Sequence, residues 1–187
     1  AWGAQNIEKV HSVVGSTLFM TAIGGSVIAA LGVFFSENIL LSLGVDPKIM
    51  HLSLPYVRWM LVGSPILFIY IIYTSILRGV GDSTTPMLAS GMTILIGLMV
   101  TPVLIAGYFG FPKMGIVAPA IATIIGFLAV LVFLYFYLNK RNHPLKMDRA
   151  LLRQIRHQPE LSRLILKLGI PTGIQMVTNS VAALVII

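Results

Sequence analysis

The chain has 187 residues, of which 57% are hydrophobic and only 10% are charged, and its mean hydropathy is +0.92. About a quarter of the residues in soluble domains are charged, so this composition excludes an ordinary water-soluble fold and predicts a membrane protein. The net charge of +7 would also suit a nucleic-acid partner, but the basic residues lie at the edges of apolar runs, as in membrane proteins. Because cysteine is absent, disulfides, thiolate metal sites and cysteine nucleophiles are excluded.

The first apolar run follows a polar lead-in at residues 1–12 and covers 13–35 without a charged residue. A run of about 20 apolar residues is long enough to cross the hydrocarbon core as a helix. Gly24, Gly25 and Gly32 within the run permit close contact with a neighbouring helix. We therefore predict the first membrane span here.

Residues 36–54 are expected to make a short excursion outside the membrane. One helical turn is predicted at 36–43, and Gly44 is expected to end it. Asp46 and Pro47 then form a favourable cap and first-turn pair for the next helix.

The second predicted span covers about residues 56–77 and contains Pro65 in its interior. A proline at such a position removes one backbone hydrogen bond and bends the helix. Arg58 lies near the outer end, where its side chain reaches the headgroups, and Trp59 suits the same interface.

A polar turn separates the second apolar run from the third. Arg78 is expected in the last turn of the preceding helix, where a cation faces the negative end of the helix dipole. Gly79 and Gly81 are expected to supply positive-φ positions that let the chain leave that helix. The candidate caps of the following helix are Asp82, Ser83 and Thr85, with Pro86 suited to its first turn.

Two further spans are predicted at 87–109, with Pro102 inside it, and at 116–138, with a brief loop at 110–115 between them. Together, residues 1–138 are thus expected to hold four transmembrane helices. Residues 169–187 begin a fifth apolar run.

Residues 139–168 form a basic connector that holds eight of the thirteen Lys and Arg residues of the chain. The positive-inside rule places this connector in the cytoplasm, together with the lead-in and the central polar turn. Apolar residues recur in it at helical spacing, with arginines opposite them. This pattern predicts either an amphipathic helix that binds anionic lipid or a plain connector whose arginines only set the topology.

The central turn resembles the signature of the multidrug and toxic compound extrusion (MATE) family, in which one helix ends in Arg-Gly-x-Gly-Asp and the next opens at Thr-Pro. The matching residues are Arg78, Gly79, Gly81, Asp82, Thr85 and Pro86. Two other stretches, 115–123 and 168–171, are similar to the openings of the family's sixth and seventh helices. The chain therefore resembles a fragment of a longer transporter, from its third helix to the start of its seventh.

This resemblance implies an all-α membrane protein, a polytopic bundle that is part of a twelve-helix, two-lobe transporter in the cell (inner) membrane. Such carriers are antiporters in which inward flow of H⁺ or Na⁺ drives export of drugs or other organic cations. The implied partners are the lipid bilayer, small cationic substrates and the remaining helices, without nucleic acid and without a cofactor other than the coupling ion. An enzyme is not expected, because no nucleophile, acid and base converge at a readable spacing.

The resemblance also points to four polar pathway residues. Tyr56 and Thr123 match positions that line a cavity in some relatives, although threonine in a membrane helix often bonds its own backbone and tyrosine often lies at an interface. Gln175 and Asn179 lie four residues apart on one helical face. They suit either a shared polar lining or hydrogen bonds between helices.

The chain departs from the family where a coupling carboxylate is expected. The four predicted spans contain no acidic residue, and the two positions before Pro102 that carry Asn and an acidic or amide residue in many relatives are Gly97 and Thr101. If an acidic residue on the family's first helix provides coupling, it lies outside this chain.

Two alternative functions remain open. A flippase for lipid-linked oligosaccharides would need basic residues in its cleft, whereas a non-transporting membrane scaffold would need no hydrated cleft. No metal site is expected, because the four histidines lack a second ligand at suitable spacing.

Overall fold

The computed structural model describes residues 7–141, 145, 163 and 167. Over these residues the chain forms four long helices, α1 (Ile7–Ser42), α2 (Pro47–Gly79), α3 (Thr84–Ala106) and α4 (Ala118–Lys140). Two short 3₁₀ turns, Tyr108–Gly110 and Gly115–Val117, lie between α3 and α4. All four helices are long and apolar enough to cross a membrane, which confirms the predicted all-α membrane fold. The expected run at 169–187 and nearly all of the connector lie outside the described residues.

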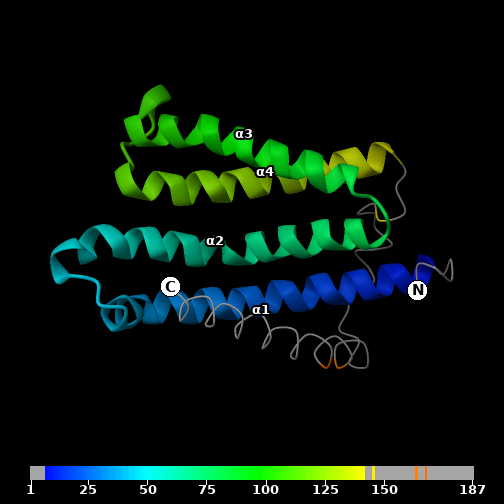
Figure 1. The fold of residues 1–187 in the computed structure, drawn as a ribbon, viewed down its shortest axis with the longest axis horizontal. Coiled ribbons are helices and arrows are strands. Elements are labelled where there is room, and N and C mark those ends of the chain that lie inside the picture. The colour runs from blue at the N-terminus through cyan, green and yellow to red at the C-terminus, as the bar shows by residue number, and fades with distance from the viewer. Residues whose placement is uncertain (1–6, 142–144, 146–162, 164–166, 168–187) are drawn as a thin grey trace, which may run out of the picture.

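The helices form two antiparallel hairpins that pack through α2 and α4 (Figure 1). Because α1 pairs with α2 and α3 pairs with α4, the spatial order is α1, α2, α4, α3, and α2 and α4 run in the same direction. One end of the bundle holds the turn at 80–83, and we call it the Asp82 end. The other end holds the turn at 43–46, and we call it the Asp46 end.

The first two helices are longer than the predicted spans. α1 continues through residues 36–42, and only residues 43–46 separate it from α2, so the excursion expected at 36–54 is a helical hairpin with a tight turn. The predicted stop and cap are confirmed: Gly44 adopts φ 78°. The Asp46 carboxylate accepts a hydrogen bond of 2.8 Å from the Lys48 backbone N–H, with Pro47 in the first turn. Glu37 does not stop the helix, because a polar side chain leaves the backbone hydrogen bonds intact.

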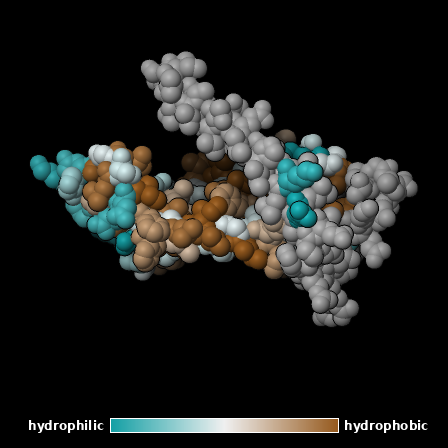
Figure 2. Space-filling view, turned by 90° about the horizontal axis from the view of Figure 1, so that it is seen from below, coloured by the Kyte–Doolittle hydropathy of each residue, from teal (hydrophilic) through white to brown (hydrophobic). Residues whose placement is uncertain are grey.

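As a result, the first hairpin projects beyond the second at the Asp46 end (Figure 1). α1 has 36 residues and α2 has 33, which corresponds to about 50 Å each at the usual helical rise. α3 and α4 have 23 residues each, about 35 Å, which is close to the thickness of the hydrocarbon core. Exposed charged residues of the hairpin, Glu37, Asp46 and Lys48, lie in this projection. Figure 2 shows hydrophilic surface at that end and apolar surface along the middle of the bundle.

The central turn differs from its prediction at one glycine. Gly79 is the last residue of α2 and is helical, whereas Gly81 adopts φ 92° and makes the exit from the helix. Asp82 is confirmed as a cap of α3, since its Oδ1 accepts a hydrogen bond of 3.0 Å from the Thr85 N–H. Arg78 lies in the last turn of α2, as expected. The third helix ends at Ala106, earlier than predicted, because Gly107 adopts φ 75°.

Side chains in the core become larger toward the Asp82 end. Buried residues of α4 recur every four positions, with Ala118, Ala122 and Gly126 in its first half and larger residues in its second: Val130, Leu134 and Leu138. The main core lies at this end and includes Val10, Val14 and Leu18 of α1 and Tyr70, Tyr73 and Leu77 of α2.

Nearer the Asp46 end, glycines permit close helix contact. A Cβ atom on Gly25 would lie 3.0 Å from the Pro65 Cα, and one on Gly63 would overlap Ile124 of α4. Gly32 likewise faces Leu61. The predicted contact role is therefore confirmed for Gly25 and Gly32, whereas no described residue lies within 4 Å of a Cβ position on Gly24.

The proline inside α2 has a local compensation. Because Pro65 has no N–H, the Leu61 carbonyl lacks its usual intrahelical donor. The Ser64 hydroxyl donates a hydrogen bond of 2.8 Å to that carbonyl, and Ser64 is buried. In lipid an unpaired carbonyl is costly, so this serine stabilises the interrupted helix.

Substituting Ser64 with alanine is expected to lower the free energy of unfolding of the full-length protein by about 1–2 kcal/mol. Ser26→Ala is the control, since the Ser26 hydroxyl bonds the Ala22 carbonyl, which already has its own helical donor. Thermal unfolding of the purified full-length protein would measure both effects. Equal stability of the two variants would show that Ser64 does not compensate for Pro65.

Candidate functional site

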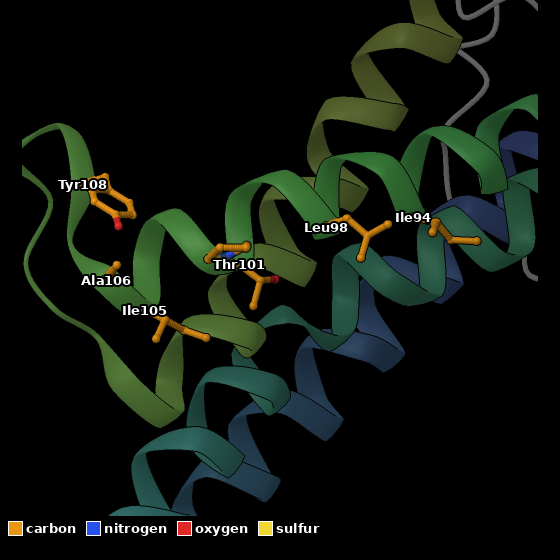
Figure 3. A pocket seen from close by; sticks show the side chains of 8 residues that line it. Ile94, Leu98, Thr101, Ile105, Ala106 and Tyr108 are labelled. Atoms are coloured by element: carbon orange, nitrogen blue, oxygen red, sulfur yellow. The ribbon is translucent and has the colours of Figure 1, made fainter.

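An open groove with a volume of about 710 Å³ runs along α3 (Figure 3). Its lining residues are Ile94, Gly97, Leu98, Thr101, Pro102, Ile105, Ala106 and Tyr108. Ile94, Leu98, Thr101 and Ile105 recur at helical spacing, so they form one face of the helix. The face that holds Ala89 and Leu104 is buried instead. The groove therefore belongs to the side of α3 that the described helices leave open.

The sequence explains why this face is hollow. Gly97 has no side chain, so a gap remains between the exposed side chains of Ile94 and Leu98. Pro102 has no N–H, so the Leu98 carbonyl lacks its usual helical donor. Ser64 donates its hydroxyl to the Leu61 carbonyl in α2, whereas Thr101, at the corresponding position before Pro102, makes no such bond to the Leu98 carbonyl.

Thr101 differs from the five other threonines that the structure places beyond the first turn of a helix. The hydroxyls of Thr17, Thr21, Thr74, Thr93 and Thr123 all donate to the carbonyl of the residue four positions earlier. The Thr101 hydroxyl, in contrast, forms no hydrogen bond with any described residue. The groove thus combines an apolar wall with the Thr101 hydroxyl, which has no partner in the described residues, beside a carbonyl that lacks its usual helical donor.

The two predicted pathway residues that the structure describes lie outside this groove. Tyr56 is half-buried in α2. Thr123 is half-buried in α4, where its hydroxyl donates a hydrogen bond of 2.8 Å to the Pro119 carbonyl of the same helix. Its hydrogen is therefore already used in a bond to the helix backbone. Neither residue lines the α3 groove. Gln175 and Asn179 lie outside the described residues, and the role of all four in a pathway stays a prediction.

The residues of the central turn form a structural element and not a pocket. Arg78 is exposed and donates from Nη2 to the Ser75 hydroxyl at 3.2 Å, whereas Thr85 and Pro86 are buried at the start of α3. Together with the Asp82 cap, these contacts hold α2 and α3 in a tight connection.

Sequence reasoning treated Thr101 only as a departure from a family pattern and therefore missed its place in a groove. The sequence gives no distinguishing signal, because Ser64 also stands directly before a proline and its hydroxyl is buried and bonded. Which face of α3 stays uncovered could not be read from the sequence, because the helix is apolar on every side.

Four membrane-length helices of predominantly apolar composition define a polytopic integral membrane protein. The MatE family model matches residues 1–103, and the chain belongs to this family of transporters. It is 40% identical over all 187 residues to a probable multidrug resistance protein, YoeA, of Bacillus subtilis, of which it covers 40%. It is 29% identical over 177 residues to a probable multidrug resistance protein, NorM, of Thermotoga maritima, covering 94% of this chain and 37% of that relative.

The structural comparison agrees with the family. A crystal structure of a MATE protein in complex with MaD3S superposes with a TM-score of 0.80 at 26% identity, covering 97% of this chain and 40% of the other. The chain thus spans about 40% of the length of the proteins it resembles.

Proposed function

We propose that the chain is part of a secondary active transporter that exports drugs or other organic cations in exchange for H⁺ or Na⁺. The observation that carries this proposal is the α3 groove, whose apolar wall holds the Thr101 hydroxyl, without a hydrogen-bond partner in the described residues, and the Leu98 carbonyl, which has lost its usual helical donor to Pro102. Membership of the MatE family and relatives described as probable multidrug resistance proteins support it. The groove volume of about 710 Å³ is in the range usual for sites of small organic molecules.

The chemistry of the groove favours a cationic, amphipathic ligand. Ile94, Leu98 and Ile105 offer apolar contact, and the ring of Tyr108 at one end can face a cation. The Thr101 hydroxyl and the Leu98 carbonyl are hydrogen-bond or ion-dipole partners for an ammonium group. No basic residue lines the groove, which argues against the pyrophosphate group of a lipid-linked oligosaccharide and hence against a flippase.

The groove also lacks a carboxylate, so residues outside it would supply the ionisable coupling group. Residues 139–168 follow α4, which ends at the Asp82 end with Lys140. The cationic excess of this connector supports a cytoplasmic Asp82 end and insertion in the inner membrane. The remaining helices of the full-length transporter would close the open side of α3.

Substituting Thr101 with valine in the full-length transporter is expected to reduce export of a fluorescent organic cation about fivefold, because one hydrogen-bond partner is lost without a change of shape. Thr93→Val is the matched control, since Thr93 lies in the same helix outside the groove and its hydroxyl is already bonded to the Ala89 carbonyl. Dye export from cells or proteoliposomes with an imposed ion gradient measures both variants.

Two results would contradict the proposal. Wild-type export by Thr101→Val, together with impaired export by Thr123→Val, would indicate that the substrate pathway lies along α4 and not along α3. Export that continues after both the proton and the sodium gradients are collapsed would rule out antiport, whatever the role of Thr101.

A further inference from the structure

Arg58 is a single cation inside a long apolar helix, and its surroundings define its level in the membrane. Gly63 of α2 packs directly on Ile124 of α4, and the two helices run in the same direction. Five residues earlier in each helix, Arg58 therefore lies level with Pro119, at the beginning of α4. Because α4 begins where the second hairpin reaches its end, Arg58 lies at a boundary of the membrane and not at its middle.

Aromatic side chains mark the same boundary. Tyr108 and Phe109, in the connection between α3 and α4, are 62% and 90% exposed, and Trp59 beside Arg58 is 45% exposed. Aromatic residues gather at the headgroup level of membranes, so the connection and the Arg58 region occupy one interface. The remainder of the first hairpin, up to Asp46, projects beyond it.

The Arg58 guanidinium is held in a defined orientation. Its Nε donates a hydrogen bond of 3.1 Å to the Ser36 Oγ, and Ser36 is fully buried in α1. The Ser36 hydroxyl in turn donates to the Val33 carbonyl at 2.8 Å, so its hydrogen is already used and its oxygen is free to accept from Arg58. This arrangement turns Nε toward the protein and leaves the two Nη groups to face outward.

The outward Nη groups have no anion within the described residues. Glu37 follows Ser36 directly and is exposed, yet neither it nor Asp46 forms an ion pair with Arg58. A guanidinium at the edge of the hydrocarbon core gains most from a planar, bidentate oxyanion. The oxyanion available at that level, in every orientation of the protein, is the phosphate of a membrane lipid.

We propose that Arg58, positioned by Ser36, binds the phosphodiester of a phospholipid in the leaflet at the Asp46 end. The acyl chains of that lipid lie along the exposed apolar surface that continues from Arg58 toward the middle of the bundle, where Met60 and Val62 of α2 are exposed. Ser36 is a positioning residue in this site, and Trp59 contacts the headgroup region.

Native mass spectrometry of the full-length transporter, delipidated and then mixed with a defined lipid, tests the site. The probes are phosphatidylglycerol and a diglucosyl-diacylglycerol that has no phosphate. We expect Arg58→Gln to weaken phosphatidylglycerol binding about tenfold, the loss typical of a charge-assisted hydrogen-bonded pair. Ser36→Ala should weaken it about threefold, as expected for loss of one neutral hydrogen bond, while the weak binding of the sugar lipid stays unchanged.

Lys113→Gln is the matched control, because Lys113 is an exposed cation in the connection at the same boundary and has no positioning partner in the described residues. Its binding of phosphatidylglycerol should equal that of the wild type. Arg58→Lys keeps the charge but not the bidentate fork, so an intermediate affinity is expected, and this variant replaces Arg58→Gln if the latter does not fold.

Three outcomes would overturn the proposal. Unchanged phosphatidylglycerol binding by the Arg58 variants would exclude Arg58 as the ligand. Equal binding of the sugar lipid would exclude the phosphate as the recognised group. Competition by soluble glycerol phosphate as strong as that by phosphatidylglycerol would indicate a site for free anions and not for a membrane lipid.

Discussion

Replacing Gly25 with valine is expected to lower the free energy of unfolding of the full-length protein by about 3 kcal/mol, the upper part of the usual range for overpacking. A Cβ at this position would lie 3.0 Å from the Cα of Pro65 and 3.1 Å from the Phe68 ring. The Pro65 Cα is backbone in the middle of α2 and cannot rotate away. The larger side chain therefore has to push α1 and α2 apart.

Gly24→Val is a close control, because it makes the same substitution one residue earlier in α1. A Cβ on Gly24 meets nothing within 4 Å, so we expect no loss of stability. Thermal unfolding of both variants, purified in the same detergent, measures the difference. If Gly24→Val and Gly25→Val lowered the stability equally, the loss would come from the change in backbone flexibility and not from the contact between α1 and α2.

The second large effect is expected at Tyr73, whose side chain is fully buried in the core at the Asp82 end. Its hydroxyl donates a hydrogen bond of 2.9 Å to the backbone carbonyl of Leu145, which is also fully buried. Tyr73→Ala removes a large aromatic side chain and this bond together, so we expect a loss of about 4 kcal/mol. The beginning of the connector loses its attachment to α2 at the same time.

Conservative variants separate the two contributions. Tyr73→Phe removes only the hydroxyl and should cost about 1–2 kcal/mol. Tyr70→Phe is the control, because the Tyr70 hydroxyl lies 3.3 Å from the Ser90 Oγ, and Ser90 keeps its own bond to the Pro86 carbonyl. Denaturant unfolding of the purified transporter measures all three. If Tyr73→Phe were as stable as the wild type, the bond to Leu145 would not contribute to stability.

The four membrane helices could be predicted because apolar runs of that length admit few other structures. Their ends are predicted less well: loss of hydrophobicity after Phe35 predicts the end of the first span there, whereas α1 continues to Ser42. The structure shows that Gly44 and the Asp46 cap end the elements, and these capping signals were also visible in the sequence. Capping residues are thus better markers of helix ends in this chain than the loss of hydrophobicity.

Details that depend on helix rotation could not be predicted. Gly24 and Gly25 are adjacent and chemically identical, yet only Gly25 faces α2. Gly79 and Gly81 are likewise two residues apart, and only the hydrogen-bond register at the helix end selects Gly81 for the left-handed conformation. The same limit applies to the site: Ser64 and Thr101 each precede a proline, but only the Thr101 hydroxyl has no hydrogen-bond partner in the described residues.

The graded side chains of the bundle have a mechanical consequence. Alanine and glycine connect the two hairpins along the first half of α4, whereas valine, leucine and tyrosine interlock at the Asp82 end. Separating the two hairpins along the half lined by alanine and glycine exposes less apolar area than separating them along the half lined by valine, leucine and tyrosine. The free-energy cost of separation is therefore lower at the Asp46 end than at the Asp82 end. Any rotation of one hairpin relative to the other would therefore have its pivot near Leu138, and the hairpins would move apart at the Asp46 end.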